Sequence, residues 1–163
     1  MAAVNYLEKK KVLIVDDEPD VLETLEELLS MCDVEKAATF DQAWDLLGSK
    51  YYDLAILDIM GVDGYRLLSL ANGRNTTAVI LTAHALSTQD VKNSYQGGAA
   101  YYIPKDEMAN IVTYLNDVLE AKEKGKSSWE RWLDRFASFF NNKFGPAWQE
   151  EDKKFWRDLK YYK

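Results

Sequence analysis

Two adjacent carboxylates, Asp16 and Asp17, follow directly after the apolar run at residues 12–15. Like charges at neighbouring positions repel each other, and a bound cation turns that repulsion into a binding site. A second apolar run, at residues 54–57, ends in a third acid, Asp58. Hard divalent cations such as Mg2+ prefer carboxylate oxygens, and a carboxylate beside such a metal can attack a phosphoryl donor to give an acyl phosphate. These three acids therefore indicate metal-assisted phosphoryl chemistry.

Two more polar side chains stand at the ends of apolar runs. Thr82 follows residues 78–81, and Lys105 lies just beyond residues 101–103. In an open parallel sheet the carboxyl ends of the strands meet at one rim, where ligands bind. We therefore expect three carboxylates, one hydroxyl and one ammonium to converge there. Three acids with one lysine are poorly suited to cradle a nucleotide but well suited to hold Mg2+ beside a phosphate.

The hydrophobic pattern predicts the elements that position these residues. Apolar or β-rich runs typical of parallel strands recur at residues 12–15, 34–38, 54–57, 78–81 and 101–103. Helix-start signals or helical spacing follow each run, beginning near residues 19, 40, 65, 88 and 111. The third of these helices is predicted to be short, residues 65–70. Five strand–helix repeats predict an α/β fold with a five-stranded parallel sheet, doubly wound with helices on both faces.

Composition limits the function classes. The chain has 163 residues and 47% hydrophobic content, which suits one packed domain with an appendage. A formal net charge of −7 argues against a dedicated nucleic-acid binder. A single cysteine, Cys32, excludes a disulfide framework and a zinc-ligand cluster. The segment MAAVNYLEKKK lacks the apolar core of a signal peptide, and no apolar run approaches membrane-spanning length, so we expect a cytoplasmic protein.

Four motifs at the predicted strand ends resemble those of response regulator receiver domains: VDD at 15–17, LAILDIM at 54–60, ILTAHA at 80–85 and YYIPK at 101–105. The resemblance covers residues 10–122 and implies a flavodoxin-like sheet of strand order 2-1-3-4-5. It also implies a place in a two-component phosphorelay, in which a histidine kinase or phosphotransfer protein donates a phosphoryl group. Such a receiver slowly dephosphorylates itself with water, and it is a signalling module and not a turnover enzyme.

The resemblance implies a role for each matching position. Asp58 matches the phosphoacceptor, and Thr82 and Lys105 match the hydroxyl and the ammonium that contact the phosphoryl group. Tyr102 matches an aromatic rotamer switch that acts with Thr82. The implied Mg2+ ligands are Asp16, Asp17, Asp58 and the backbone carbonyl of Met60, with Asp17 the more direct ligand of the acidic pair.

Each of these residues also has a plain structural interpretation. Asp16 and Asp17 could merely cap the following helix. Thr82 could bond to the backbone, and Lys105 could be a solvated surface lysine. All these explanations would have to coincide at matching strand ends, so we favour the signalling interpretation. A degenerate receiver that serves as a constitutive interaction scaffold stays open as an alternative. A phosphatase with an aspartate nucleophile is disfavoured, because Met60 occupies the position of its usual second aspartate.

Two departures from the family pattern surround the site. The segment DIMGVDG at 58–64 lacks the usual proline and is shorter than in most relatives, so the carbonyl of Met60 could be displaced from the metal. Many relatives follow the lysine with a proline in a cis peptide bond, whereas here Asp106 follows Lys105. We therefore expect either a strained bond or a different loop at this point.

The rest of the chain has a different character. Residues 123–126 form a predicted linker, and residues 127–163 form a predicted helical extension broken at Phe-Gly-Pro, residues 144–146. Aromatic residues recur in the extension at helical spacings: Trp129, Trp132, Phe136, Phe139 and Phe140, then Trp148, Phe155, Trp156 and Tyr162.

Three roles compete for this extension. It could fold back on the receiver, dock to a downstream effector or a second copy, or lie on a membrane or nucleic acid. Its interspersed acids disfavour the last role. Exposure of such an aromatic face forfeits about 2 kcal/mol per ring. We therefore expect an ordered helical pair whose aromatic face is buried against the last receiver helix or against a second copy.

Overall fold

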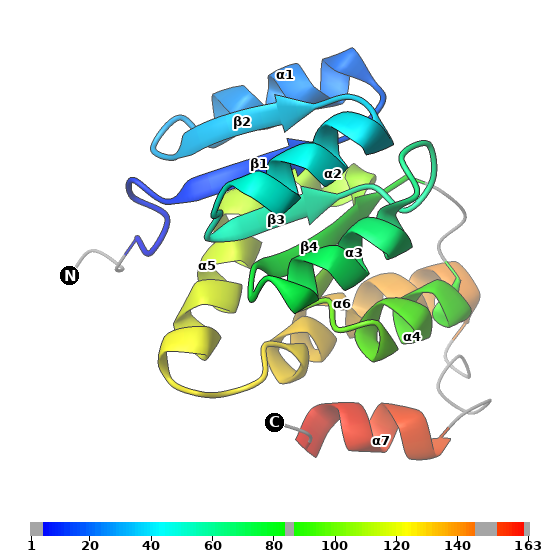
Figure 1. Ribbon diagram of the computed structural model, residues 1–163. Helices are drawn as coiled ribbons and strands as arrows, with labels where there is room; N and C mark the ends of the chain where they lie inside the picture. Colours follow the sequence, from blue (N-terminus) through cyan, green and yellow to red (C-terminus); the bar gives the residue numbers. More distant parts are fainter. Residues whose placement is uncertain (1–4, 84–86, 146–152, 162–163) are drawn as a thin grey trace.

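A five-stranded parallel sheet forms the centre of the molecule (Figure 1). The computed structural model describes residues 5–83, 87–145 and 153–161. The strand order is β2-β1-β3-β4-β5, which confirms the predicted flavodoxin-like order. The strands are β1 (Lys11–Val15), β2 (Asp33–Ala37), β3 (Leu54–Leu57), β4 (Thr77–Thr82) and β5 (Tyr101–Pro104).

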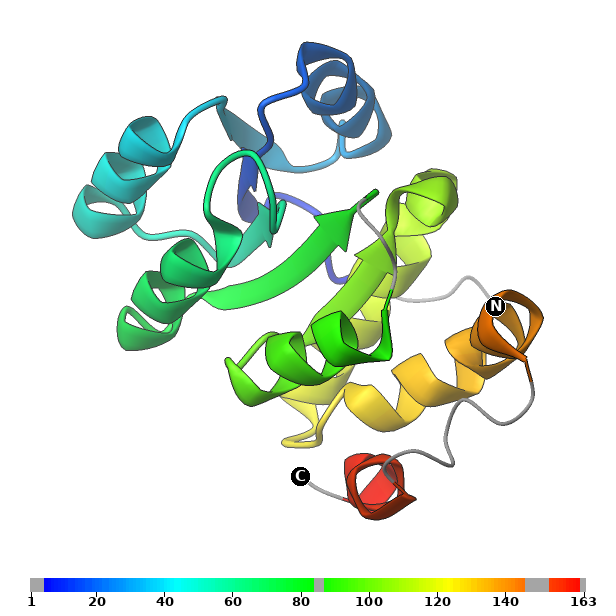
Figure 2. The same cartoon turned by 90° about the vertical axis from the view of Figure 1, so that its right-hand side faces the viewer.

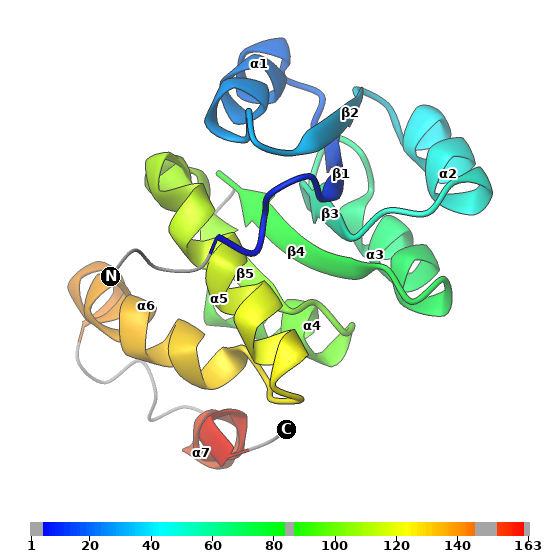
Figure 3. The ribbon, with the colours of Figure 1, turned by 90° about the vertical axis from the view of Figure 1, so that its left-hand side faces the viewer.

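Helices cover both faces of the sheet, as the alternating pattern predicts. Figure 3 shows α1 and α5 on one face and α2, α3 and α4 on the other. Their bounds are α1 (Pro19–Leu28), α2 (Phe40–Ser49), α3 (Gly64–Gly73), α4 (Thr88–Gln96) and α5 (Ile111–Glu123). Every residue of β3 is buried, and so are four of the five residues of β1. This two-sided burial explains why these strands are continuous apolar runs and not alternating ones.

Local signals place the ends of several helices. Pro19 occupies the first turn of α1, where its missing N–H costs nothing. At the start of α2 the Thr39 hydroxyl accepts a hydrogen bond from the N–H of Gln42 at 3.2 Å, and the Gln42 side chain accepts one from the N–H of Ala38 at 3.0 Å. These two hydrogen bonds cap the helix, and its predicted start near residue 40 is confirmed.

Two local expectations were incomplete. Helix α3 runs to Gly73 and not to residue 70. Ala71 in its last turn is fully buried, and the Asn72 side chain donates to the carbonyl of Gly97, so tertiary contacts extend the helix. A short 3-10 helix, Lys105–Asn110, also connects β5 to α5 and was not predicted. All peptide bonds among the described residues are trans, so the loop after Lys105 differs from the family's cis-proline form.

The C-terminal extension contains two helices, α6 (Trp129–Phe144) and α7 (Lys153–Tyr161). Pro146, Trp148 and Tyr162 lie outside the described residues. Helix α6 packs beside β5, at the end of the sheet opposite β2 (Figure 2). Its buried aromatic side chains are Trp129, Trp132, Phe136 and Phe140. The extension is thus a helical pair whose aromatic face is buried within the same chain. Among the described residues, no helix combines the length and apolar character needed to cross a membrane.

Phe136 joins α6 to the receiver core. Its ring is 1% exposed and contacts Tyr101 of β5 at 6.2 Å and Tyr114 of α5 at 5.1 Å between centroids. Phe139 on the same helix is only partly buried and touches Phe136 and Phe140.

We predict that Phe136→Ala lowers the free energy of unfolding by about 3–5 kcal/mol, because it empties a fully packed site. Phe139→Ala is the matched control, and it should cost clearly less because its ring is partly solvated. Urea unfolding followed by circular dichroism measures both values. Equal, small losses for the two variants would show that α6 does not belong to the cooperative core.

Candidate functional site

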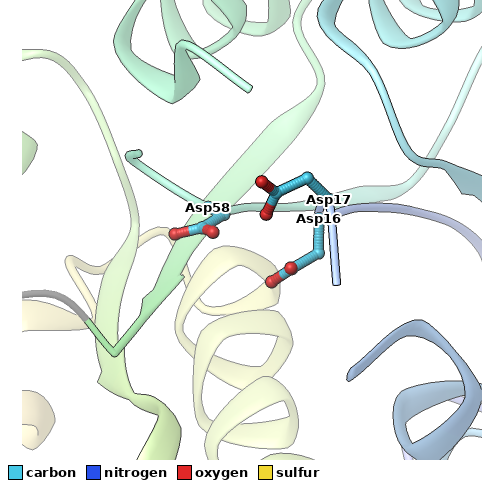
Figure 4. Close-up of side chains that lie close together, drawn as sticks. All are labelled: Asp16, Asp17 and Asp58. Atoms are coloured by element: carbon cyan, nitrogen blue, oxygen red, sulfur yellow. The ribbon is translucent and has the colours of Figure 1, made fainter. Parts of the chain in front are cut away.

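Three carboxylates converge at the carboxyl end of the sheet. Asp16 and Asp17 follow β1 and Asp58 follows β3, the neighbouring strand. One oxygen from each lies within 4.8 Å of the others, and Figure 4 shows the three side chains gathered at one place. The N–H of Asp58 donates to the carbonyl of Val15 at 3.1 Å, so the parallel ladder itself sets the spacing of the acids. The predicted convergence of the three acids is therefore present.

Lys105 extends its ammonium into this cluster from the end of β5. Its Nζ lies 2.8 Å from Asp16 Oδ2 and 3.4 Å from both Asp58 Oδ2 and Glu18 Oε2. The side chain is only 11% exposed, so it is not a solvated surface lysine. Sequence reasoning missed Glu18. The signal for it was the third consecutive acid in the DDE run, next to the pair already singled out.

Negative charge exceeds positive charge among these side chains, because one ammonium faces three carboxylates. Asp16 is 2% exposed, and this burial raises its pKa above the usual value. The nearby charge of Asp58 raises the pKa further. The hydrogen bonds that Asp16 accepts from the Lys105 ammonium and from the N–H of Glu18 act in the opposite direction. Burial works against the charge of Lys105, yet the hydrogen bond to Asp16 and the charges of Asp58, Asp16 and Glu18 outweigh it and raise its pKa. The positive charge of Lys105 is thus stabilised by several carboxylates. The negative charge of Asp16 is not stabilised enough to offset its burial. An added cation would relieve this excess of negative charge.

The loop after Asp58 approaches the acids closely. Gly61 has a φ of +60°, and a Cβ built there would lie 2.6 Å from Asp17 Oδ2. A Cβ on Gly64 would lie 2.0 Å from the carbonyl oxygen of Asp58. At Gly64 the close atom is backbone, so only glycine fits, and at Gly61 the positive φ and the nearby Asp17 carboxylate favour glycine. The carbonyl of Met60 accepts a hydrogen bond from the N–H of Val62, and the Met60 side chain is 49% exposed.

Thr82 and Tyr102 lie on β4 and β5, the two strands that follow β3 in the sheet. Thr82 is the last residue of β4, which pairs with β3, and it is fully buried. The ring of Tyr102 on β5 is fully buried too, and its hydroxyl has no hydrogen-bond partner among the described residues. Burial, followed by the nearby Asp90, Tyr65 and Asp58, raises the pKa of this phenol. An uncharged, buried phenol is therefore the form present at neutral pH.

This arrangement suits one kind of chemistry. Carboxylate oxygens from two neighbouring strands can hold a divalent cation such as Mg2+, and the donor set fits its preference for hard oxygen ligands. Asp58 belongs to the same cluster and can act as a nucleophile toward phosphorus. Lys105 supplies positive charge opposite the same carboxylate.

Comparison with known proteins places the chain in a family. The family model of the response regulator receiver domain matches residues 12–116. Response regulator Rre1 of Synechocystis sp. is 36% identical over 117 residues, which cover 64% of this chain and 50% of the relative. The transcriptional regulatory protein MalR of Bacillus subtilis is 34% identical over 114 residues, or 65% of this chain and 48% of the relative. The chain therefore spans about half the length of these curated relatives.

Solved structures show the same fold. A CheY-like receiver domain protein from Methanospirillum hungatei superposes with a TM-score of 0.65 at 26% identity, covering 72% of this chain and 98% of that one. The BeF3-activated receiver domain of DrrB gives a TM-score of 0.62 at 21% identity, covering 69% and 98%. The fold, the acidic rim and the matched sequence agree, and the chain belongs to the response regulator receiver domain family.

Proposed function

We propose that this chain is a phosphorylation-dependent signalling receiver that accepts a phosphoryl group on Asp58. The observation that carries the proposal is the cluster of Asp16, Asp17 and Asp58 within 4.8 Å, with the Lys105 ammonium 3.4 Å from Asp58. Receivers are signalling proteins and generally not turnover enzymes. The donor is a histidine kinase or a phosphotransfer protein, in the cytoplasm. Output passes through protein contacts with a downstream effector.

In the proposed reaction a carboxylate oxygen of Asp58 attacks the phosphorus of a phosphohistidine. The new O–P bond forms as the P–N bond breaks, and the electron pair leaves with the imidazole. Asp16, Asp17, Asp58 and the Met60 carbonyl would hold Mg2+, which supplies positive charge against the incoming phosphate when bound. The hydrogen bond that Met60 accepts from Val62 leaves its second lone pair for this purpose.

The remaining residues act on the product. Lys105 pairs with a phosphoryl oxygen, since its ammonium already faces Asp58. The Thr82 hydroxyl donates to another phosphoryl oxygen, and this contact favours the buried rotamer that the Tyr102 ring already occupies. Water slowly hydrolyses the acyl phosphate and resets the receiver. The alternative, a degenerate receiver that acts only as a scaffold, predicts that none of these steps occurs.

The first test is phosphoryl uptake. Incubation with acetyl phosphate and Mg2+ should add the mass of one phosphoryl group, measured on the intact protein. Asp58→Asn should abolish this added mass, and so should chelation of the metal. Asp41→Asn, an exposed acid on α2, is the matched control and should be labelled like the wild type. Undiminished labelling of Asp58→Asn would contradict the assignment of the phosphoacceptor.

A second test uses the charge imbalance at Asp16. Because the pKa of Asp16 is raised in the folded state, stability is fully present below the unfolded-state pKa and is lost as pH rises through the folded-state pKa. Asp16→Asn removes the buried charge, so without metal it should raise the melting temperature at pH 7, by about 2–4 °C for each kcal/mol regained.

The same variant should lose most of the stabilisation that Mg2+ gives the wild type. Asp20→Asn, exposed on α1, controls for the change in net charge. Thermal unfolding with a chelator and with Mg2+ measures both effects. A melting temperature that falls in Asp16→Asn without metal would mean that its pairing with Lys105 outweighs burial.

A third test addresses the switch. Thr82→Ala should still be phosphorylated, because it leaves Asp58 and the acids intact. The ring resonances of Tyr102 should shift on phosphorylation in the wild type and by less than about half as much in Thr82→Ala, because the hydroxyl contact is lost. Thr113→Ala, an exposed threonine on α5, is the control. Equal shifts in all three proteins would rule out the Thr82–Tyr102 coupling.

A further inference from the structure

A large pocket lies at the end of the sheet opposite the three carboxylates. Residues 76–78 and 99–100, where β4 and β5 begin, form one part of its lining. The rest comes from α4, the last turn of α5, the start of α6, and Phe155 of α7 (Figure 3). Its volume is about 920 Å3, and small-molecule sites typically enclose about 300–1,000 Å3. The pocket is therefore large enough to hold an organic ligand.

The pocket is built jointly by the receiver and its C-terminal extension, and contacts between the two hold its walls in place. The indole N–H of Trp129 donates to the carbonyl of Ala99 at 2.8 Å, and the Ser128 hydroxyl donates to the carbonyl of Ala100. Further along α6, Arg135 donates to both carboxylate oxygens of Asp117 on α5. Such a two-pronged contact fixes orientation as well as adding energy. The wall that α6 contributes is thus positioned before any ligand arrives.

Three aromatic rings from three helices form an apolar corner of the pocket. The ring of Tyr95 on α4 meets the ring of Trp129 edge-on at 5.5 Å, and it meets Phe155 of α7 in the same way at 5.5 Å. Tyr95 and Phe155 are only partly buried, so both rings keep surface for a ligand to cover. Aromatic rings of this kind bind other flat rings by stacked or edge-on contact.

Positive charge lies beside this aromatic corner. Lys122 and Lys126 line the pocket, and none of the described lining residues is acidic. The Lys122 ammonium donates to the Thr77 hydroxyl at 3.0 Å, which is a neutral partner. Among the described residues neither lysine forms an ion pair, whereas Lys124 on the same connection pairs with Glu120 at 2.7 Å. In a chain of net charge −7, two ammonium groups without a carboxylate favour an anionic ligand.

We propose that this pocket binds a small organic anion with a flat aromatic body. The ring of the ligand packs against Tyr95, Trp129 and Phe155, and its carboxylate lies at Lys122 and Lys126. A mostly apolar lining with a few placed polar groups is the usual composition of a small-molecule site. Because the ligand contacts the receiver and the extension at once, it stabilises their docked arrangement. This site is separate from the acids and does not depend on phosphoryl chemistry.

Nuclear magnetic resonance of the full chain, with 2-naphthoate as the probe, tests the proposal. Titration should shift the indole N–H resonance of Trp129 and the amide resonances of residues 76–78 and 99–100. The expected dissociation constant is about 1 mM or tighter, given the size of the probe. The indole of Trp44, 41% exposed on α2 and outside the pocket, is the internal control and should not shift.

Lysine variants test the ionic part of the site. Lys126→Met keeps the length of the side chain but removes the ammonium, and it should weaken binding of 2-naphthoate about tenfold. Lys122→Met should have a similar effect. Lys124→Met is the matched control, because its ammonium pairs with Glu120 and does not line the pocket. The neutral amide, 2-naphthamide, should bind the wild type about tenfold more weakly and should not respond to any of the three substitutions.

The outcomes decide between occupants. Shifts at Trp129 that weaken in Lys122→Met and Lys126→Met, but not in Lys124→Met, support the proposal. An unshifted Trp129 resonance, or equal affinity for the acid and the amide, overturns it. Concentration-dependent dimerisation in sedimentation velocity that Lys126→Met abolishes would assign the pocket to a second copy and would also overturn it. The comparison of acid and amide uses the wild type, so it decides the question even where a variant does not fold.

Discussion

Lys105 brings one buried ammonium to carboxylates that follow two different strands, β1 and β3. The rim can be built only if β1, β3, β4 and β5 end together, since a shift of β5 by one residue would move the lysine about 3 Å from its partners. Parallel pairing without a bulge satisfies this requirement across the four strands. Lys105 does not neutralise all of these carboxylates, and a bound metal ion or an incoming phosphate group would change the negative charge that is left. The register of the strands therefore determines the electrostatics of the site.

Most of the receiver was predictable because four of its strands, β1, β3, β4 and β5, are almost entirely buried. Such strands are short apolar runs, and a polar residue marks the end of each: Asp16, Asp58, Thr82 and Lys105. The distances among these side chains were not predictable, because they depend on register between strands far apart in sequence. Glu18 was missed for the same reason: its neighbour in space is Lys105, 87 residues away. The end of α3 was misplaced because Asn72 bonds to Gly97, which no local pattern reveals.

The C-terminal extension shows a different limit of sequence reasoning. Aromatic spacing predicted a buried face on α6, and Trp129, Trp132, Phe136 and Phe140 are indeed buried. Apolar spacing says nothing about where indole N–H groups point. Their partners are backbone carbonyls of Ala99 and Tyr102, which leave no side-chain signature. The last receiver helix was the expected neighbour, and α5 does contribute Asp117 and Tyr114, but the edge of β5 is an equal part of the surface.

The two edge strands of the sheet, β2 and β5, are protected in different ways. This difference affects how the receiver behaves when it is studied without the C-terminal extension. β2 is the other outer strand, and its sequence, DVEKA, places charged side chains along it. Charges of this kind discourage edge-to-edge association. β5, with the sequence YYIP, carries no charge within the strand and relies on α6 for cover. A fragment ending at residue 122 would keep every acid of the rim but expose an uncharged strand edge beside aromatic rings. Self-association of such a fragment would then reflect where it was cut and not how the whole chain assembles.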